Sequence, residues 1–365
     1  MTPTLTGRLV PAAACAAALL LAGCSDADPA AEPAPAAPSS TTAVPTETPP
    51  TVSTSEPPPP AKPLRQVPRD VLAISVDGLT PAVLDELTPE QVPSFTRLFN
   101  EGAVTMNART EVEMTVTLPN HTGMLTGRRI DPDRGGHGVT WNQEVGDAIV
   151  PGADHEGVAS VFDVVHDAGG TSALFAGKEK FVIYDRSWPD IDRFEVKLDP
   201  DSLVDDVQAD LSGAGRRFTF LHLALPDAAG HPTGWLSLAY RGAVLETDRL
   251  LGELLATIDA TPRLKRRLVV VLTADHGGPR GEQEHDDAGN PANYTIPFVV
   301  WGRSIRPADL YALNPDLVDP GDAQPSYDGP QPVRNGDVAN LVTDLLGLGP
   351  VPGSELDAAQ DIDWR

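Results

Sequence analysis

Residues 71–78 read VLAISVDG, a short apolar run that ends directly in an aspartate and a glycine. Its hydrophobicity is continuous rather than alternating, which is typical of a strand buried on both faces of a parallel sheet. Open α/β sheets bind their ligands beyond the carboxyl ends of the strands. Asp77 therefore stands where such a sheet places its functional side chains.

Three further segments have the same character, and a fourth shows it more weakly. They read FTFLHLAL (218–225), LVVVLT (268–273), TIPFVVW (295–301) and, more weakly, TSALF (171–175). Between them, apolar residues of 161–168 and of 236–259 recur at helical spacing. A last helix is predicted at 335–346, after surface loops at 307–332. This alternation predicts a doubly wound α/β domain, in which helices flank a mostly parallel sheet.

The N-terminus has the features of a bacterial export signal. Arg8 is the only charged residue in 1–23, an apolar run spans 9–21, and residues 21–24 read LAGC. The run is too short for a comfortable membrane span, which needs about 20 apolar residues. The tetrapeptide resembles a lipobox, so we expect an exported protein, lipidated on Cys24 and anchored to the outer face of the bacterial cell membrane.

Residues 24–69 consist mostly of Ala, Pro, Ser, Thr and Glu and lack apolar periodicity. Such a composition cannot offset the chain entropy of folding, so we predict a disordered, partly polyproline tether. The folded domain is then expected at 70–365. The cysteines, Cys15 and Cys24, fall in the signal and at the proposed anchor, which leaves no thiol for a disulfide or a metal.

The chain is strongly acidic, with 52 Asp and Glu against 27 Lys and Arg and a net charge of −25. A protein of this charge offers no basic face to a nucleic-acid polymer, so we expect none as a partner. The hydrophobic fraction of 41% is sufficient for a large core. The composition does not determine an oligomeric state.

Metal-type side chains follow three of the predicted strands. They are Asp77 after the first strand, Asp227 and His231 after the second, and Asp275, His276 and His285 after the third. A single aspartate after a strand is usually a turn or helix cap. Three aspartates and three histidines at one sheet edge indicate instead two metal sites with three ligands each. Mixed Asp and His ligation favours zinc, and other divalent transition metals remain open.

Together these motifs resemble the alkaline phosphatase superfamily, and within it the type I phosphodiesterase/nucleotide pyrophosphatase branch. The resemblance covers most of residues 70–303. It rests on the segments VDG (76–78), TLPNH (117–121), LTGR (125–128), HGV (137–139), DAAGH (227–231) and TADHG (273–277). It implies an alkaline-phosphatase-like core and a two-zinc hydrolase of phosphodiester or pyrophosphate bonds.

The resemblance also implies residue roles. One zinc would be held by Asp227, His231 and His285, and the other by Asp77, Asp275 and His276, with Thr117 as the nucleophile on the second metal. His285 follows His276 by only nine residues, a spacing found in compact bacterial relatives but not in the animal enzymes.

The residues around Thr117 suit this chemistry. A threonine hydroxyl is a poor nucleophile at neutral pH, and coordination to a metal is the available way to activate it. Pro119 suits the first turn of a helix, whose N-terminus would favour a phosphoryl group. Asn120 is expected to donate its amide to a phosphoryl oxygen, with a local helix-start hydrogen bond as the alternative. His121 is given no chemical role.

Lys178 and Lys180 resemble a lysine pair that some phosphomonoesterases and phosphonoacetate hydrolases of the superfamily aim at substrate oxygens. A monoester carries a charged oxygen that a diester lacks, so such a pair would favour monoesters or a carboxylate-bearing phosphonate. The alternative is two solvated surface lysines.

The motifs are also compatible with several alternative functions. The substrate is expected to be a small phosphate ester or phosphonate, with phosphomonoesterase or phosphonate hydrolase as the runner-up to diesterase. A transferase to a cell-envelope acceptor stays open, because only the acceptor differs. Thr117 cannot become formylglycine, which argues against a sulfatase. A catalytically silent surface lipoprotein is the non-enzyme alternative, and the complete set of site residues argues against it.

Overall fold

One sheet runs through the part of the chain that the computed structural model describes, residues 69–152 and 157–364. Its eight strands lie in the order β4-β3-β5-β1-β6-β7-β2-β8. Among these strands only β7 runs against its neighbours, β6 and β2. The predicted signal peptide, Cys24 and the tether up to residue 68 lie outside the described residues.

The strands have the following bounds. They are β1 Asp70–Val76, β2 Ala103–Arg109, β3 Ser172–Ala176, β4 Arg193–Val196, β5 Phe218–Leu223, β6 Leu268–Thr273, β7 Thr295–Gly302 and β8 Ala308–Asp309. All five predicted strands are present, and the mostly parallel sheet is confirmed. Strands β2, β4 and β8 were not predicted, because each is short or carries polar side chains that break the apolar pattern.

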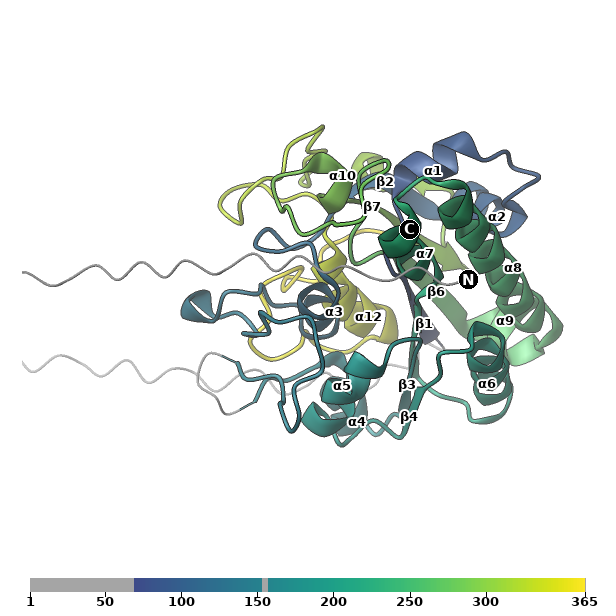
Figure 1. Ribbon diagram of the computed structural model, residues 1–365. Coiled ribbons are helices and arrows are strands. Elements are labelled where there is room, and N and C mark those ends of the chain that lie inside the picture. Colours follow the sequence, from purple (N-terminus) through teal and green to yellow (C-terminus); the bar gives the residue numbers. More distant parts are fainter. Residues whose placement is uncertain (1–68, 153–156, 365) are drawn as a thin grey trace, which may run out of the picture. The chain divides into compact units, whose positions relative to one another are not determined.

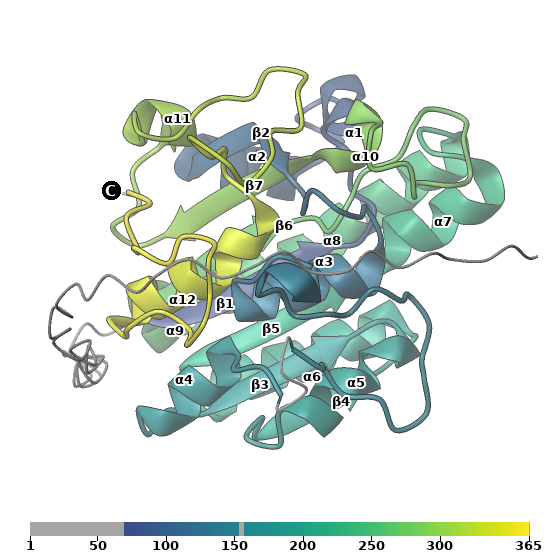
Figure 2. The same cartoon turned by 90° about the vertical axis from the view of Figure 1, so that its left-hand side faces the viewer.

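Helices cover both faces of the sheet, as Figures 1 and 2 show, which confirms the doubly wound architecture. One face carries α3 Thr117–Thr126, α4 Val161–Asp167, α5 Val182–Ser187 and α12 Val338–Leu346. The other carries α1 Pro81–Glu86, α2 Pro93–Glu101, α6 Pro200–Gly213, α8 Leu238–Ala260 and α9 Pro262–Arg267. The remaining short helices are α7 Leu225–Thr233, α10 Pro291–Tyr294 and α11 Leu310–Leu313.

Three predicted boundaries differ from the structure. Strand β5 ends at Leu223, two residues before the predicted end, because the helix α7 begins at Leu225, with Pro226 in its first turn. The predicted helix 335–346 is a 3-10 turn, Asn335–Asp337, that runs into α12. The predicted loops at 307–332 include the two-residue strand β8 and the helix α11.

The three central strands form the core on which the site stands. Every residue of β1, β5 and β6 is buried, and Leu250, Leu254 and Ile258 of α8 pack into the same core. The register aligns the strand ends, since Val76 of β1 lies opposite Leu223 of β5 and Ser75 opposite Thr273 of β6. Side chains that follow these strands are therefore held close together on a rigid support. Among the described residues, no helix has the length and apolar character needed to span a bilayer.

Candidate metal centre

Backbone contacts bring together the segments that follow β1, β5 and β6. The amide of Asp227 donates to the carbonyl of Asp77 (3.1 Å), and the amide of Gly78 donates to Asp275 Oδ1 (3.0 Å). Gly78 has φ +69°, a conformation that side chains rarely adopt, and a Cβ there would lie 3.0 Å from Asp227 Cα. Glycine is thus needed directly after Asp77, because the chain turns sharply there and packs against Asp227 of α7.

Asp227 and His231, which follow β5, lie in the helix α7. Pro226 stands in the first turn of this helix, where its missing N–H costs no hydrogen bond. A separation of four residues puts two side chains on one helix face. The helix therefore aligns Asp227 and His231, and His231 Nε2 lies 3.4 Å from Asp227 Oδ1.

The first ligand group consists of Asp77, Asp275 and His276, all of them buried. His276 Nε2 lies 3.5 Å from Asp77 Oδ1 and 3.3 Å from Asp275 Oδ2. These three atoms have no hydrogen-bond partner within the described residues, although each is buried. Buried polar atoms normally have partners, so their convergence fits a site for a cation.

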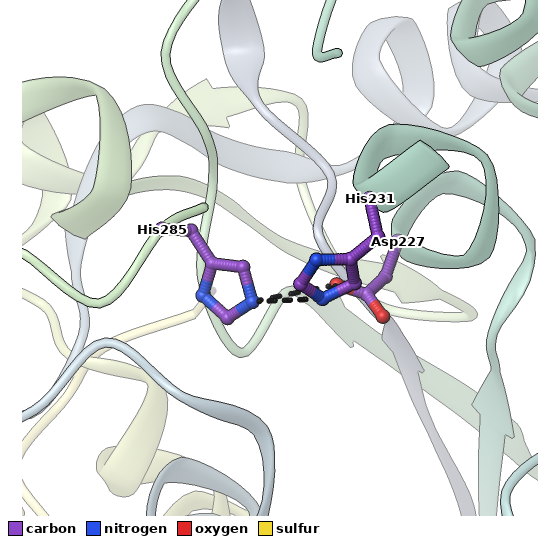
Figure 3. Close-up of side chains that lie close together, drawn as sticks. All are labelled: Asp227, His231 and His285. Carbon is purple, nitrogen blue, oxygen red and sulfur yellow. Dashed lines mark hydrogen bonds and ion pairs between the residues drawn. The ribbon is translucent and has the colours of Figure 1, made fainter. Parts of the chain in front are cut away.

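The second ligand group consists of Asp227, His231 and His285 (Figure 3). His285 Nε2 lies 3.3 Å from His231 Nε2 and 3.6 Å from Asp227 Oδ1. His285 comes from the loop after β6, whereas the other two come from α7. The structure thus brings the six predicted Asp and His residues together in the two predicted sets.

Backbone carbonyls orient the three histidines. The Nδ1–H groups of His231, His276 and His285 donate to the carbonyls of Gln283 (2.8 Å), Gly277 (2.9 Å) and Thr115 (2.7 Å). The Nε2 lone pairs therefore point into the groups, and His231 and His285 oppose each other with two acceptors. This arrangement is repulsive unless a metal ion or a proton lies between them, since the hydrogen bond to Asp227 raises the pKa of His231. The Nδ1 contacts match the outer contacts of metal-binding histidines. The donor set fits a divalent metal in each group.

The charges of the two groups also fit bound cations. Burial lowers the pKa of His276 to about 3, so this imidazole is neutral and its Nε2 can bind a metal. Burial raises the pKa of Asp275 well above its usual range, and the nearby Asp77 carboxylate raises it further. Three carboxylates this close cannot all ionise cheaply without added positive charge.

Thr117 is the first residue of α3 and is buried. Contacts on either side of it tie this helix start to the ligand groups. Thr115 Oγ1 donates to the carbonyl of His285 (2.5 Å), and His121 Nδ1 lies 3.5 Å from Asp275 Oδ2. The predicted helix start, with Pro119 in its first turn, is confirmed. The helix N-terminus lies against both groups.

His121 cannot serve Thr117 as a base. Its Nδ1–H donates to the carbonyl of Thr117 (2.8 Å), and its Nε2 accepts from Ser75 Oγ (2.8 Å). Burial lowers its pKa well below the usual range, so the ring is neutral. It fastens α3 to β1, which agrees with the absence of a predicted chemical role.

In this structure the side-chain amide of Asn120 is engaged by the chain itself, and its predicted contact with a phosphoryl oxygen stays a prediction. The amide of the buried Asn120 side chain donates to the carbonyls of Met114 (2.8 Å) and Val116 (3.0 Å). Its oxygen accepts from the amide of Glu111 (3.0 Å) and from Asn335 Nδ2 (3.1 Å). Both amide hydrogens are thus occupied, and Asn120 shapes the segment before α3, the local alternative.

Backbone amides of the first turn of α3 are also engaged. The amide of Leu118 donates to Asn142 Oδ1 (3.0 Å), the amide of Asn120 donates to the carbonyl of Val116 (3.3 Å), and Pro119 has none. What α3 offers a phosphoryl group is thus mainly the Thr117 hydroxyl and the helix dipole.

The two predicted lysines have different surroundings. Lys178 Nζ lies 2.5 Å from Asp77 Oδ2 and 2.5 Å from Asp227 Oδ2, so it contacts both ligand groups. Lys180 Nζ donates to Asn142 Oδ1 (2.9 Å). Both line an open cavity of about 360 Å³, whose walls are Asn142, Gln143, Glu144, Lys178, Glu179, Lys180 and Leu198. Lys180 faces this cavity, whereas Lys178 is committed to carboxylates.

Three residues of this region were missed in the sequence. Asn142 joins the start of α3 to Lys180, and His222 Nε2 donates to Asp77 Oδ2 (2.8 Å). The buried Trp235 donates from Nε1 to the carbonyl of Gly78 (3.0 Å) and packs near His231 and His285, with ring centroids 5.5 and 5.4 Å away. His222 lies in a continuous apolar run, where a lone histidine was a visible signal. Asn142 and Trp235 lie in loops that carry no spacing signal.

Comparisons with known proteins agree with this geometry. The family described as type I phosphodiesterase/nucleotide pyrophosphatase matches residues 71–329. No curated protein matches the sequence. Among solved structures, inactive murine ectonucleotide pyrophosphatase/phosphodiesterase 5 in complex with AMP is 14% identical, with a TM-score of 0.58, and the match covers 80% of this chain and 99% of that one.

Two bacterial structures share the fold as well. The lipoteichoic acid synthase LtaP from Listeria monocytogenes is 14% identical, with a TM-score of 0.52 and coverage of 77% of this chain and 72% of that one. The C-terminal periplasmic domain of EcEptC from Escherichia coli is 15% identical, with a TM-score of 0.53 and coverage of 81% and 87%. At such identities the likeness is one of fold.

Proposed function

The chain belongs to the type I phosphodiesterase/nucleotide pyrophosphatase family, and from this premise we propose that it cleaves phosphodiester or pyrophosphate bonds through a phospho-threonine intermediate on Thr117. Membership of the family makes the protein a phosphoric ester hydrolase. The observation that carries the finer proposal is the pair of three-ligand groups, which contact the segment around the start of α3 through Thr115 and His121. Their mixed Asp and His donors favour zinc in both groups.

Two bound divalent cations would supply polarisation of a phosphoryl oxygen and a lowered pKa of the attacking hydroxyl. The chain's own residues do the rest. Asp77, Asp275 and His276 would hold one cation, and Asp227, His231 and His285 would hold the other. Thr117 Oγ1 forms a bond to phosphorus as the bond to the leaving ester oxygen breaks, and the hydroxyl gives up its proton while the departing oxygen takes one up. Water then cleaves the phospho-threonine bond and returns the hydroxyl.

A phosphomonoester or phosphonate is the second candidate substrate, and Lys180 favours it. Its ammonium lines the cavity next to the ligand groups and is held there by Asn142. An additional anionic oxygen of a monoester, or the carboxylate of a phosphonate, would gain a charge-assisted hydrogen bond from it. If this holds, Lys180→Ala reduces kcat/KM for monoesters far more than for diesters. Equal losses would remove the argument for monoesters.

The decisive experiment is a substrate panel on the purified, zinc-loaded protein. It includes nitrophenyl phosphate, bis(nitrophenyl) phosphate, nucleotide diesters, a phosphonate and nitrophenyl sulfate. We expect diesters to be cleaved fastest and the sulfate not at all. A protein that binds zinc but turns over none of these would be the silent lipoprotein, and turnover only with an added acceptor would identify a transferase.

We also propose that the protein is exported and lipid-anchored through Cys24. The support is the sequence LAGC at residues 21–24 after an apolar run. Labelling with a fatty acid during expression in a bacterium tests this, with Cys24→Ser as the control. Incorporation of label into both forms, or into neither, would refute the anchor.

A further inference from the structure

The side chain of Lys178 lies between the two ligand groups. Its Nζ contacts Asp77 Oδ2, from the first group, and Asp227 Oδ2, from the second, each at 2.5 Å. The other oxygen of each carboxylate, Oδ1, has no hydrogen-bond partner among the described residues and faces the histidines of its group. Lys178 therefore binds the Oδ2 atom of each aspartate. The Oδ1 atoms remain available as metal ligands.

His222 completes this arrangement from the buried strand β5. Its Nε2 contacts Asp77 Oδ2 at 2.8 Å, and its Nδ1 accepts from the amide of Gly177 at 3.2 Å. With Nδ1 as the acceptor, the ring proton is on Nε2 and is donated to Asp77. Because Gly177 directly precedes Lys178, the contacts form a closed ring through Asp77, His222, Gly177 and Lys178.

The ammonium is well suited to this place. Two carboxylates, those of Asp77 and Asp227, lie against its Nζ. Only 18% of the side chain is exposed. Charge-assisted hydrogen bonds from one ammonium to two carboxylates fix the distance between them. No other lysine of the described residues has ion pairs to both ligand groups.

We propose that Lys178 is a positioning residue which, together with His222, sets the orientation and spacing of the two metal sites, rather than a residue that binds substrate. The proposal rests on the two-metal centre of the proposed function. Outer contacts of this kind hold metal ligands in their productive geometry, and their loss typically costs 10- to 100-fold in metal affinity, an order-of-magnitude expectation.

The test uses the protein loaded with Mn²⁺, because two Mn²⁺ ions in adjacent sites give an exchange-coupled electron paramagnetic resonance signal. In Lys178→Met we expect this signal to be lost and the weaker of the two Mn²⁺ affinities to fall by about 10- to 100-fold. A lysine that acted only as a repelling charge would predict the opposite, tighter binding in the variant. Lys180→Met is the matched control, because Lys180 contacts Asn142 and neither group, and it should keep the coupled signal.

The outcomes separate this proposal from the proposed function. Wild-type protein without a coupled pair would refute the two-metal centre itself. A coupled pair that persists in Lys178→Met, with unchanged or tighter Mn²⁺ binding, would refute the positioning role alone. If Lys178→Met does not fold, ¹⁵N-lysine spectra of the zinc-loaded wild type decide, with Lys180→Met used for assignment. A slowly exchanging Lys178 ammonium supports the role, and rapid exchange with solvent overturns it.

Discussion

At the scale of single residues, Asp77 and the three histidines use one side-chain atom as a candidate metal ligand and another for a hydrogen bond or ion pair that orients the side chain. Asp77 Oδ2 is held by Lys178 and His222, while Oδ1 is left without a partner among the described residues. The histidines use Nδ1 for backbone carbonyls and present Nε2. The residue type determines which kind of ligand atom is offered. The partner of the other side-chain atom determines where that ligand atom points.

Thr117→Ala tests the nucleophile. Because the variant keeps all six Asp and His ligands, we expect near-normal zinc content but a loss of turnover of at least about 10⁴-fold. Thr126→Ala, the same change in the last turn of α3, should keep turnover, since its hydroxyl donates to the carbonyl of Thr122 and accepts from the amide of Arg128, and neither partner belongs to a ligand group. Zinc content and kcat are measured on both variants. Full activity in Thr117→Ala would place the nucleophile elsewhere.

Glu111 should make stability depend on pH. Burial raises the pKa of this carboxyl from 4.5 to about 8, so the folded protein keeps a proton that the unfolded chain has lost between these values. The folded state then binds more protons, and the free energy of unfolding falls as pH rises from about 4.5 to about 8, by on the order of 1 kcal/mol per pH unit.

Glu111→Gln removes this titration. The free energy of unfolding of both proteins is measured with urea at several pH values. The value for Glu111→Gln minus the value for the wild type should rise as pH rises from about 4.5 to about 8. Asp337 and Asp357 also have raised pKa values, about 7 and about 8, and contribute equally to both proteins. Parallel curves for the two proteins would show that Glu111 is not the titrating group.

At the scale of elements, the site depends on the different structures that follow the three central strands. Strand β1 is followed by a glycine turn, β5 by the helix α7 and β6 by a loop that returns with His285. The buried Trp235 lies against this junction, and its ring contacts residues of both α7 and the loop. Packing around Trp235 should therefore govern the second ligand group in particular.

Gly278→Ala tests that packing. A Cβ at this position would meet Trp235 Cδ2 at 2.2 Å, so the indole must move. We expect a loss of about 1–3 kcal/mol in stability, together with weaker zinc binding by His231 and His285. Gly242→Ala is the control, because this exposed glycine in α8 has no atom near its missing Cβ, and it should gain about 0.5–1 kcal/mol. Unchanged zinc binding in Gly278→Ala would contradict the role given to Trp235.

At the scale of the whole molecule, the two ligand groups join segments from residue 77 to residue 285. Buried carboxylates and facing histidines in these groups cost folding free energy, which bound cations would offset. Metal should thus stabilise the entire domain, not only the site.

Chelation of the zinc-loaded protein should lower its melting temperature and abolish hydrolysis. A site held at a thousandfold excess of metal over its Kd contributes about 4 kcal/mol, and readdition of zinc should restore both properties. Asp227→Asn, which weakens one group, should show a smaller drop in melting temperature on chelation. Full activity after verified removal of metal would exclude the two-metal mechanism.

The sequence by itself determined the five strands β1, β3, β5, β6 and β7, the doubly wound arrangement and the six Asp and His residues of the candidate ligand groups. These features follow from local patterns, because buried parallel strands are continuously apolar and their carboxyl ends meet at one edge. Tertiary structure alone decided how Asn120, Lys178, His222 and Asn142 act. Their partners are distant in sequence or are backbone groups, and no spacing reveals which atoms of a side chain are already occupied.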